Sequence, residues 1–238
     1  EGLSSLSEAM RLMRQDSDRN SLTVWTAPTF ASKWLMPRLP AFLEEHSGID
    51  MRLSADPNLI DQASIKGTIS ADDLRLNNVD IAIRFGRGSY PGCRVDKLSK
   101  AQERAVPLCS PKLLEGEHPL LTPEDLQHHV LLHDDTRYEG RPSWSDWLTE
   151  FKITGIDTNR GLHFSQATLA LDAAADGQGV LLTMEPLAAA DLQTGRLVIP
   201  FDLSMPMSRA YYVISLESRA RQKNVVAFRK WILDKANS

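Results

Sequence analysis

The fold is decided early in the chain by the run LTVWTAPTFASKWLMPRL, which spans residues 22–39. The run opens with a short β-rich segment at 22–26, and a helical pattern of apolar residues follows at 30–45. Apolar residues then alternate with polar ones in a second strand-like segment, at Ile49, Met51 and Leu53. A strand, a helix and a strand in this order predict two parallel strands joined by a right-handed crossover.

The rest of the chain continues this alternation after a polar segment with helical stretches at 58–78. Further strands are predicted at 79–85, 105–109, 130–133, 161–164, 180–183 and 210–216. Helices are predicted at 143–151, 165–175, 186–190 and 224–235, with a further helix start at 122–126. Because strands and helices alternate, we expect a doubly wound α/β architecture.

Two extended segments, 103–107 and 205–209, are predicted hinges between two lobes. Lobe I would then contain residues 21–105 and 208–238, and lobe II residues 106–207. This layout predicts a ligand-binding cleft between the carboxyl ends of strands from both lobes.

The first 20 residues predict a helix with a heptad seam. Its apolar residues are spaced three, four and three apart, at Leu3, Leu6, Met10 and Met13. Two interpretations stay open: an amphipathic helix packed on its own domain, or the end of a longer linker helix that forms a dimer. Because the sequence begins with Glu1 instead of Met, we expect a fragment or a processed product.

Composition narrows the possible functions. The chain has 238 residues, of which 42% are hydrophobic and 24% charged, as is usual for a folded globular protein. Its formal net charge of -4 gives no reason to expect direct binding to a nucleic-acid backbone. No apolar run is long enough for a transmembrane helix. Cys93 and Cys109 show no metal-binding or redox spacing and fit a reducing compartment, although a disulfide between them stays open.

A search for catalytic motifs finds none. Gly86-Arg-Gly88 begins like a dinucleotide-binding fingerprint, but Pro91 stands at the position of the third glycine. His129 and His133 are predicted on one strand, where their imidazoles would lie about 13 Å apart at about 3.3 Å per residue. We therefore predict no catalytic residue, no metal site and no cofactor. An enzyme whose groups meet only in space stays an alternative.

Several stretches, taken together, resemble the effector-binding domain of LysR-type transcriptional regulators. They are 22–39, 42–53, 79–86, 106–114, 164–180 and the segment Tyr211-Tyr-Val213 ahead of a terminal helix. Each is weak alone, but their order and spacing agree with the subgroup that includes the glycine-cleavage activator and the β-lactamase regulator. The heptads of residues 1–20 look like the end of the linker helix of this family. The polar segment 58–78 looks longer than is usual for the subgroup.

The resemblance implies two Rossmann-like lobes joined by two crossover strands, a type 2 periplasmic-binding-protein-like fold. It implies a small-molecule effector in the inter-lobe cleft, a homodimer, a tetramer in the full-length protein, and a cytoplasmic location without a membrane. Operator DNA would be bound only by a winged helix-turn-helix domain, which is absent from this sequence. A solute-binding protein of a transporter is the main alternative, because it shares the two-lobed architecture.

Polar candidates for the effector site come from two predicted helix starts. Thr29 lies where the first strand turns into a helix, next to Phe30, and Ser165, Gln166 and Thr168 open a helix of the other lobe. Free backbone N–H groups at such positions, together with hydroxyl groups, suit a ligand with negative or acceptor groups. Plain helix capping is the alternative role for these residues.

The other candidates combine a charge with apolar walls. Arg84 is an arginine inside an apolar strand, where it could bind a carboxylate of the ligand or pair with Asp80 or another carboxylate. Phe85, Met184 and Tyr212 could form the walls of the cleft, with core packing as the alternative. Helical spacing assigns Trp34, Trp144 and Trp147 to the core.

Overall fold

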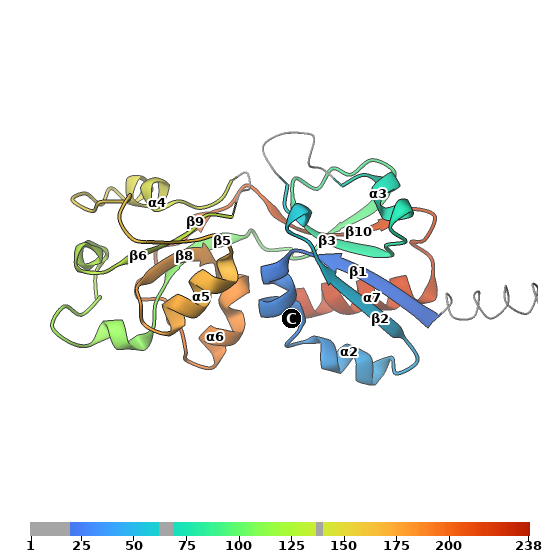
Figure 1. Cartoon of the computed structure of the whole chain (residues 1–238), viewed down its shortest axis with the longest axis horizontal. Helices are drawn as coiled ribbons and strands as arrows, with labels where there is room; N and C mark the ends of the chain where they lie inside the picture. The colour runs from blue at the N-terminus through green and yellow to red at the C-terminus, as the bar shows by residue number, and fades with distance from the viewer. Residues whose placement is uncertain (1–19, 62–68, 137–139) are drawn as a thin grey trace, which may run out of the picture.

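The computed structural model describes residues 20–61, 69–136 and 140–238. The predicted heptad helix therefore lies outside the described residues, apart from its last position. The described chain forms two five-stranded sheets that lie side by side, each with its own helices (Figure 1). This is the predicted α/β fold with two lobes.

The first sheet, with its helices, is lobe I. Its strands stand in the order β2 (Asp50–Ala55), β1 (Ser21–Thr26), β3 (Ile81–Gly86), β10 (Ala210–Leu216) and β4 (Cys93–Lys97). β1 is parallel to both β2 and β3, which confirms the predicted β-α-β unit. β10 arrives from the end of the chain and runs antiparallel between β3 and β4.

The second sheet, with its helices, is lobe II. Its strands stand in the order β7 (Leu162–Phe164), β6 (Leu131–Asp134), β8 (Val180–Met184), β5 (Arg104–Leu108) and β9 (Met205–Pro206). β6 is parallel to β7 and β8, whereas β5 is antiparallel to β8 and β9. Each sheet thus contains an antiparallel strand next to its parallel ones.

The chain passes between the lobes twice. It leaves lobe I after β4 to enter β5, and it returns from β9 to β10 (Figure 1). Both predicted hinge segments fall at these two passages. The exact lobe boundaries stay a prediction.

The predicted helix 30–45 is wrong as a single element. The structure has a π-helical segment η1 (Phe30–Leu35), a turn, and then α2 (Leu39–Glu45). Pro37 lies in that turn and has no N–H to donate to the preceding helical turn, so a regular helix stops there. Arg38 donates from its side chain to the Trp34 carbonyl oxygen at 2.9 Å, which satisfies one acceptor of the interrupted helix.

Both lobes carry further helices beside their sheets. Lobe I carries α3 (Ala71–Leu76) and α7 (Lys223–Ala236), and lobe II carries α4 (Trp144–Glu150), α5 (Ala167–Ala175), η6 (Glu185–Ala188) and α6 (Ala189–Gln193). Short 3-10 turns form η2 (Pro57–Leu59), η4 (Pro111–Leu114) and η5 (Pro123–His128). The predicted helix start at 122–126 is therefore a 3-10 turn, although Thr122 and Asp125 form a capping box at its beginning.

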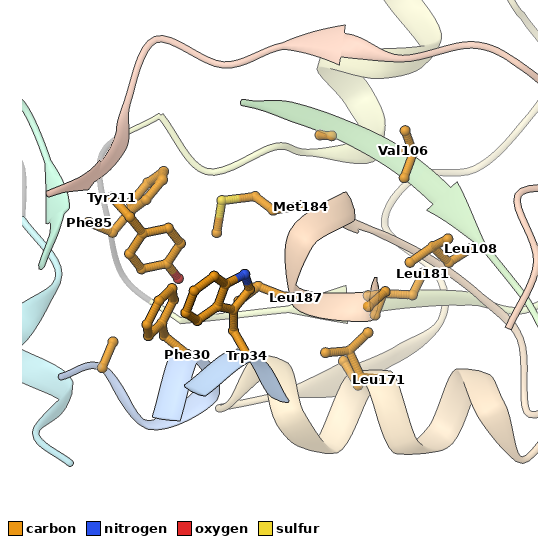
Figure 2. Packing of buried hydrophobic residues seen from close by; sticks show 14 of the residues in the cluster. Phe30, Trp34, Phe85, Val106, Leu108, Leu171, Leu181, Met184, Leu187 and Tyr211 are labelled. Atoms are coloured by element: carbon orange, nitrogen blue, oxygen red, sulfur yellow. The ribbon is translucent and has the colours of Figure 1, made fainter. Parts of the chain in front are cut away.

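The hydrophobic core runs from one lobe to the other. Trp34, Trp144 and Trp147 are buried, as predicted. Figure 2 shows Phe30 and Trp34 from η1 packed close to Met184 and Leu187, which belong to lobe II. The lobes thus share apolar contacts beside the two connecting segments.

Two further sequence expectations concern thiols and membranes. Cys93 and Cys109 are free, so they form no disulfide with each other. Over the described ranges, no helix is long and apolar enough to cross a membrane.

Candidate functional site

A small cavity lies between the lobes, at the edge where the parallel strands of both sheets end. Its lining comes from both lobes and consists of Ala27, Thr29, Ile60, Phe85, Asp134, Thr136, Ala167, Met184, Leu187 and Tyr211. Apart from Ile60, which follows η2, these residues lie at or just after the carboxyl ends of β1, β3, β6 and β8, at the start of β10, and on the first turns of α5 and η6. Open α/β sheets bind ligands at this edge. The cavity has a volume of about 20 Å³, which is enough for one water molecule.

Larger hollows occur elsewhere on the surface. One of about 510 Å³ is lined by residues 126–131, 155–157, 160 and 161 of lobe II. β6 begins at Leu131, so this hollow lies at its amino end, away from the edge where the strands of both lobes end. We therefore place the candidate site at the smaller cavity between the lobes.

Two threonine hydroxyls from different lobes meet beside the cavity. Thr29 follows β1 of lobe I, and Thr168 lies in the first turn of α5 of lobe II. The Thr168 hydroxyl donates a hydrogen bond to the Thr29 hydroxyl oxygen at 3.1 Å. Both side chains are half-buried, so a ligand entering between the lobes would meet these hydroxyls.

The amino end of α5 offers backbone donors at the same place. Gln166 is the N-cap residue, and no side-chain hydrogen bond caps the helix. The N–H of Leu169 donates to the Gln166 carbonyl oxygen at 3.1 Å, which leaves the N–H groups of Ala167 and Thr168 without an acceptor within the helix, and such groups favour a ligand with acceptor or negative groups. Ala167, the first residue of α5, lines the cavity directly.

A buried carboxylate borders the cavity from the end of β6. The Oδ1 atom of Asp134 accepts hydrogen bonds from the Thr136 backbone N–H, at 2.9 Å, and from the Thr136 hydroxyl. Burial raises the pKa of the Asp134 carboxyl, and the hydrogen bonds from Thr136 and the charge of Arg141 offset part of that rise.

Aromatic rings form the apolar wall of the site. The centroid of the Tyr211 ring lies 4.5 Å from that of Phe30 and 5.0 Å from that of Phe85. Phe30 also stacks on Trp34 at 4.9 Å. In Figure 2 the thioether of Met184 points toward this aromatic group from the side of lobe II.

An ion-pair network joins the lobes next to the threonine pair. Lys33 of η1 donates from Nζ to Asp172 of α5 at 2.7 Å and to Asp191 of α6 at 3.4 Å. Arg196 also pairs with Asp191, at 3.0 Å. These charges hold η1 against two helices of lobe II.

The structure brings together some of the sequence-predicted site residues. Thr29, Phe85 and Met184 line the cavity, and Thr168 joins them through its hydrogen bond to Thr29. Phe30 is buried behind Tyr211, where it contributes to the wall through ring contacts.

Tyr212 does not line the cavity, because its side chain lies on the other face of the sheet from Tyr211. Tyr211 stands opposite Phe85 in the β10–β3 register, and Tyr212 stands opposite Arg84. Successive side chains of a strand point to opposite faces, so Tyr211 lines the cavity while Tyr212 packs near Tyr90, with ring centroids 6.4 Å apart.

Arg84 pairs with a carboxylate of the protein itself, which was the alternative to binding a ligand. This carboxylate is not the expected Asp80. It is fully buried, pairs with Asp61, and donates to the Asn58 carbonyl oxygen at 2.8 Å. The Tyr90 hydroxyl donates to the same Asp61 carboxylate at 3.0 Å. Asp80 instead pairs with Arg219 at 2.8 Å.

Ser165 and Gln166 lie beside the site but do not line the cavity. Both are exposed, and α5 begins two residues later than predicted. The Ser165 carbonyl oxygen accepts from the Thr136 hydroxyl at 3.5 Å, which is a long contact.

Sequence reasoning missed several lining residues. For Asp134 a signal existed, since it directly follows the strand predicted at 130–133, at the edge where ligands bind. Tyr211 could not be separated from Tyr212, because both faces of β10 are largely buried. Ile60 comes from an irregular segment whose position no sequence pattern fixes. Leu187 lies in η6, within the helix predicted at 186–190, but the pattern did not show that its side chain lines the cavity.

Comparison with solved structures defines the fold class of the protein. The fold is similar to the effector domain of the transcriptional regulator AmpR of Pseudomonas aeruginosa, with a TM-score of 0.66 and 30% identity, over 91% of this chain and 95% of that chain. The AmpR effector binding domain of Citrobacter freundii agrees in fold with a TM-score of 0.68 at 24% identity, over 91% of this chain and 98% of that one. The chain is thus a two-lobed domain of the type 2 periplasmic-binding-protein kind, as predicted.

The family follows from the sequence match. The chain belongs to the LysR substrate binding domain family, whose model matches residues 15–237. It is 41% identical over 233 residues to the glycine cleavage system transcriptional activator of Escherichia coli K12, covering 98% of this chain and 70% of that relative. The HTH-type transcriptional activator AmpR of Pseudomonas aeruginosa is 32% identical over 222 residues, covering 92% of this chain and 67% of that relative. The predicted LysR-type effector-binding domain is therefore confirmed.

Proposed function

We propose that this domain senses a small molecule bound in the inter-lobe cavity and does not convert it chemically. The observation that carries the proposal is the hydrogen bond between Thr29 and Thr168. It links the two lobes beside a cavity at their strand ends, and Thr29 lines that cavity. The relatives support a sensing role, since they are named as transcriptional activators.

The ligand would act by changing the arrangement of the lobes. The cavity of about 20 Å³ is too small for a metabolite, so an effector has to part the lobes and replace the Thr29–Thr168 bond. A ligand shifts such an equilibrium only by its differential affinity for the two arrangements. A 100-fold preference for one arrangement corresponds to about 2.7 kcal/mol.

The proposed site keeps most of the sequence-predicted residues and adds two. Thr29, Thr168 and the first turn of α5 would bind acceptor groups of the ligand, with Ser165 and Gln166 at the rim. Phe85, Met184 and Tyr211 would contact its apolar part, with Tyr211 in place of Tyr212. Asp134 would add a carboxylate.

The effect of the ligand on DNA binding would depend on the assembled regulator. We infer a homodimer, and a tetramer of the full-length regulator, acting in the cytoplasm without a membrane. Operator DNA would be contacted only by a winged helix-turn-helix domain. The net charge of -4 supports this division, because DNA-contacting domains usually carry a basic face.

A ligand screen tests the proposal. Thermal-shift measurements with small metabolites should identify compounds that raise the midpoint of unfolding, since a ligand that binds the native state stabilises it. Calorimetric titration should then show at least tenfold weaker binding to Thr29→Val. Unchanged affinity in this variant, with the fold intact by circular dichroism, would remove the cavity from the proposed function.

A further inference from the structure

The carboxylate of Asp134 lies at the cavity, and only one of its two oxygens accepts hydrogen bonds within the local turn. The residue is 8% exposed and lines the cavity. Both hydrogen bonds from Thr136 reach Oδ1, and no other residue in the described ranges donates to Oδ2. Oδ2 is not among the described buried polar atoms that lack a partner, so it remains open to water or to a donor from a ligand.

The surroundings of this carboxylate suit a cation. The described lining contains no lysine or arginine, and its wall includes the aromatic rings of Phe85 and Tyr211. Among the described residues, Arg141 is the cation that acts on Asp134, and it pairs with the neighbouring Asp135 at 3.5 Å. A carboxylate beside aromatic faces is a combination that attracts ammonium groups.

We propose that Asp134 recognises a protonated amine, so that the effector of this domain carries an ammonium group. This inference rests on the proposed function, because it describes the same cavity. The ammonium group donates to Oδ2 of Asp134, while acceptor groups of the same ligand face Thr29, Thr168 and the first turn of α5.

A purely structural role in the turn at Thr136 would not explain why residue 134 carries a charge. The turn at Thr136 needs one oxygen that accepts two hydrogen bonds, and the side-chain oxygen of an asparagine would serve equally. What the aspartate adds at this position is a negative charge, which burial disfavours. A cationic ligand offsets that cost and gives the charge a function.

Methylammonium chloride is a suitable probe, because it is a small primary ammonium ion. We would follow backbone amide shifts of the isotope-labelled chain by NMR, with potassium chloride at matched ionic strength as a salt control. Sodium acetate provides a small anion for comparison. Asp134→Asn removes the charge, and Asp202→Asn is the matched control, since Asp202 is an exposed aspartate of the same lobe.

The expected result is saturable shifts at Asp134, Thr136 and Ala167 with methylammonium, beyond those caused by potassium chloride. Asp202→Asn should bind as the parent does, and Asp134→Asn at least tenfold more weakly. If Asp134→Asn fails to fold, the comparison of methylammonium with acetate on the unmodified chain still tests the inference.

Two results would overturn the inference. They differ in what they say about the cavity as a ligand-binding site. If acetate shifts these amides and methylammonium does not, the cavity binds ligands but not through a cation. If methylammonium acts no differently from potassium chloride, or binds equally well to Asp134→Asn, the role of Asp134 is rejected. The metabolite screen with Thr29→Val then decides separately whether the cavity is the effector site.

Discussion

The hydroxyl of Thr168 donates a hydrogen bond to the hydroxyl of Thr29 at 3.1 Å, although the two residues are 139 positions apart in the chain. Thr29 follows a strand of lobe I and Thr168 opens a helix of lobe II. The bond therefore reports the relative position of the lobes, and a ligand between them has to break or replace it.

The first prediction concerns this pair. Thr168→Val removes the donor while nearly conserving shape, so we expect a loss of about 1 kcal/mol in the free energy of unfolding. Effector affinity should fall at least tenfold, because the valine leaves ligand acceptor groups without this hydroxyl.

Thr168→Ser is the matched control, since it keeps the hydroxyl. It should retain the affinity of the parent within about threefold. Urea unfolding and calorimetric titration measure the two effects. Equal binding by Thr168→Val and Thr168→Ser would show that the hydroxyl makes no contact with the effector.

The second prediction concerns the ion pairs between the lobes. Lys33→Met keeps the alkyl chain but removes the charge that pairs with Asp172 and Asp191. Arg196 still pairs with Asp191, so the cost in unfolding free energy should stay near 1 kcal/mol. The lobes should separate more easily, which small-angle scattering would detect as a larger radius of gyration.

A double-mutant cycle gives the control for that experiment. The coupling between Lys33→Met and Asp172→Asn should be about 0.5–1 kcal/mol, as for a partly exposed pair. A coupling of zero, together with an unchanged radius of gyration, would argue that this contact does not hold the lobes together.

Local sequence patterns predicted most of the fold. The strand at 22–26, the helix after it and the alternation at 49–53 are enough to define a parallel β-α-β unit, because periodicity reports which face is buried. The helix was wrong only where Pro37 interrupts it. β4 was missed because Arg94 and Asp96 alternate with its apolar residues on an edge strand, where hydrophobic patterning is weak.

The site was less predictable, because its residues meet through tertiary contacts. β10 lies between two strands and is largely buried on both faces, so its pattern could not show that Tyr211 rather than Tyr212 lines the cavity. The partner of Arg84 is Asp61, which lies 23 residues earlier in a segment predicted as a polar loop. Sequence patterns indicate burial, but they do not indicate which distant groups pair.

The third prediction concerns that buried pair. Arg84 is fully buried, and Asp61→Asn removes the carboxylate charge that pairs with it. Removing one partner of a buried ion pair costs about 3–5 kcal/mol, so we expect Asp61→Asn to lower the free energy of unfolding by that amount. Asp72→Asn is the control, because Asp72 pairs with Arg75 at 2.6 Å on the surface and should cost less than about 0.5 kcal/mol. Similar losses in the two variants would contradict a structural role for the buried pair.

The fourth prediction concerns pH. Glu103 is 5% exposed, and burial raises the pKa of its carboxyl, with Lys97 offsetting part of the rise. Between the ordinary pKa of a glutamate, about 4.3, and the raised value, the folded chain binds more protons than the unfolded chain. The contribution of Glu103 to stability is therefore present at low pH and is lost as pH rises through this window.

Glu103→Gln removes this titration, so the variant should lose less stability than the parent as pH rises from about 4 to 7. At neutral pH it should be as stable as the parent or more so, because the buried charge is gone. Urea unfolding at several pH values measures the difference, and Glu150→Gln, on the exposed face of α4, is the matched control. If Glu103→Gln and Glu150→Gln follow the parent's pH profile alike, Glu103 titrates normally, and the ionised carboxylate is then stabilised in place by groups other than Lys97.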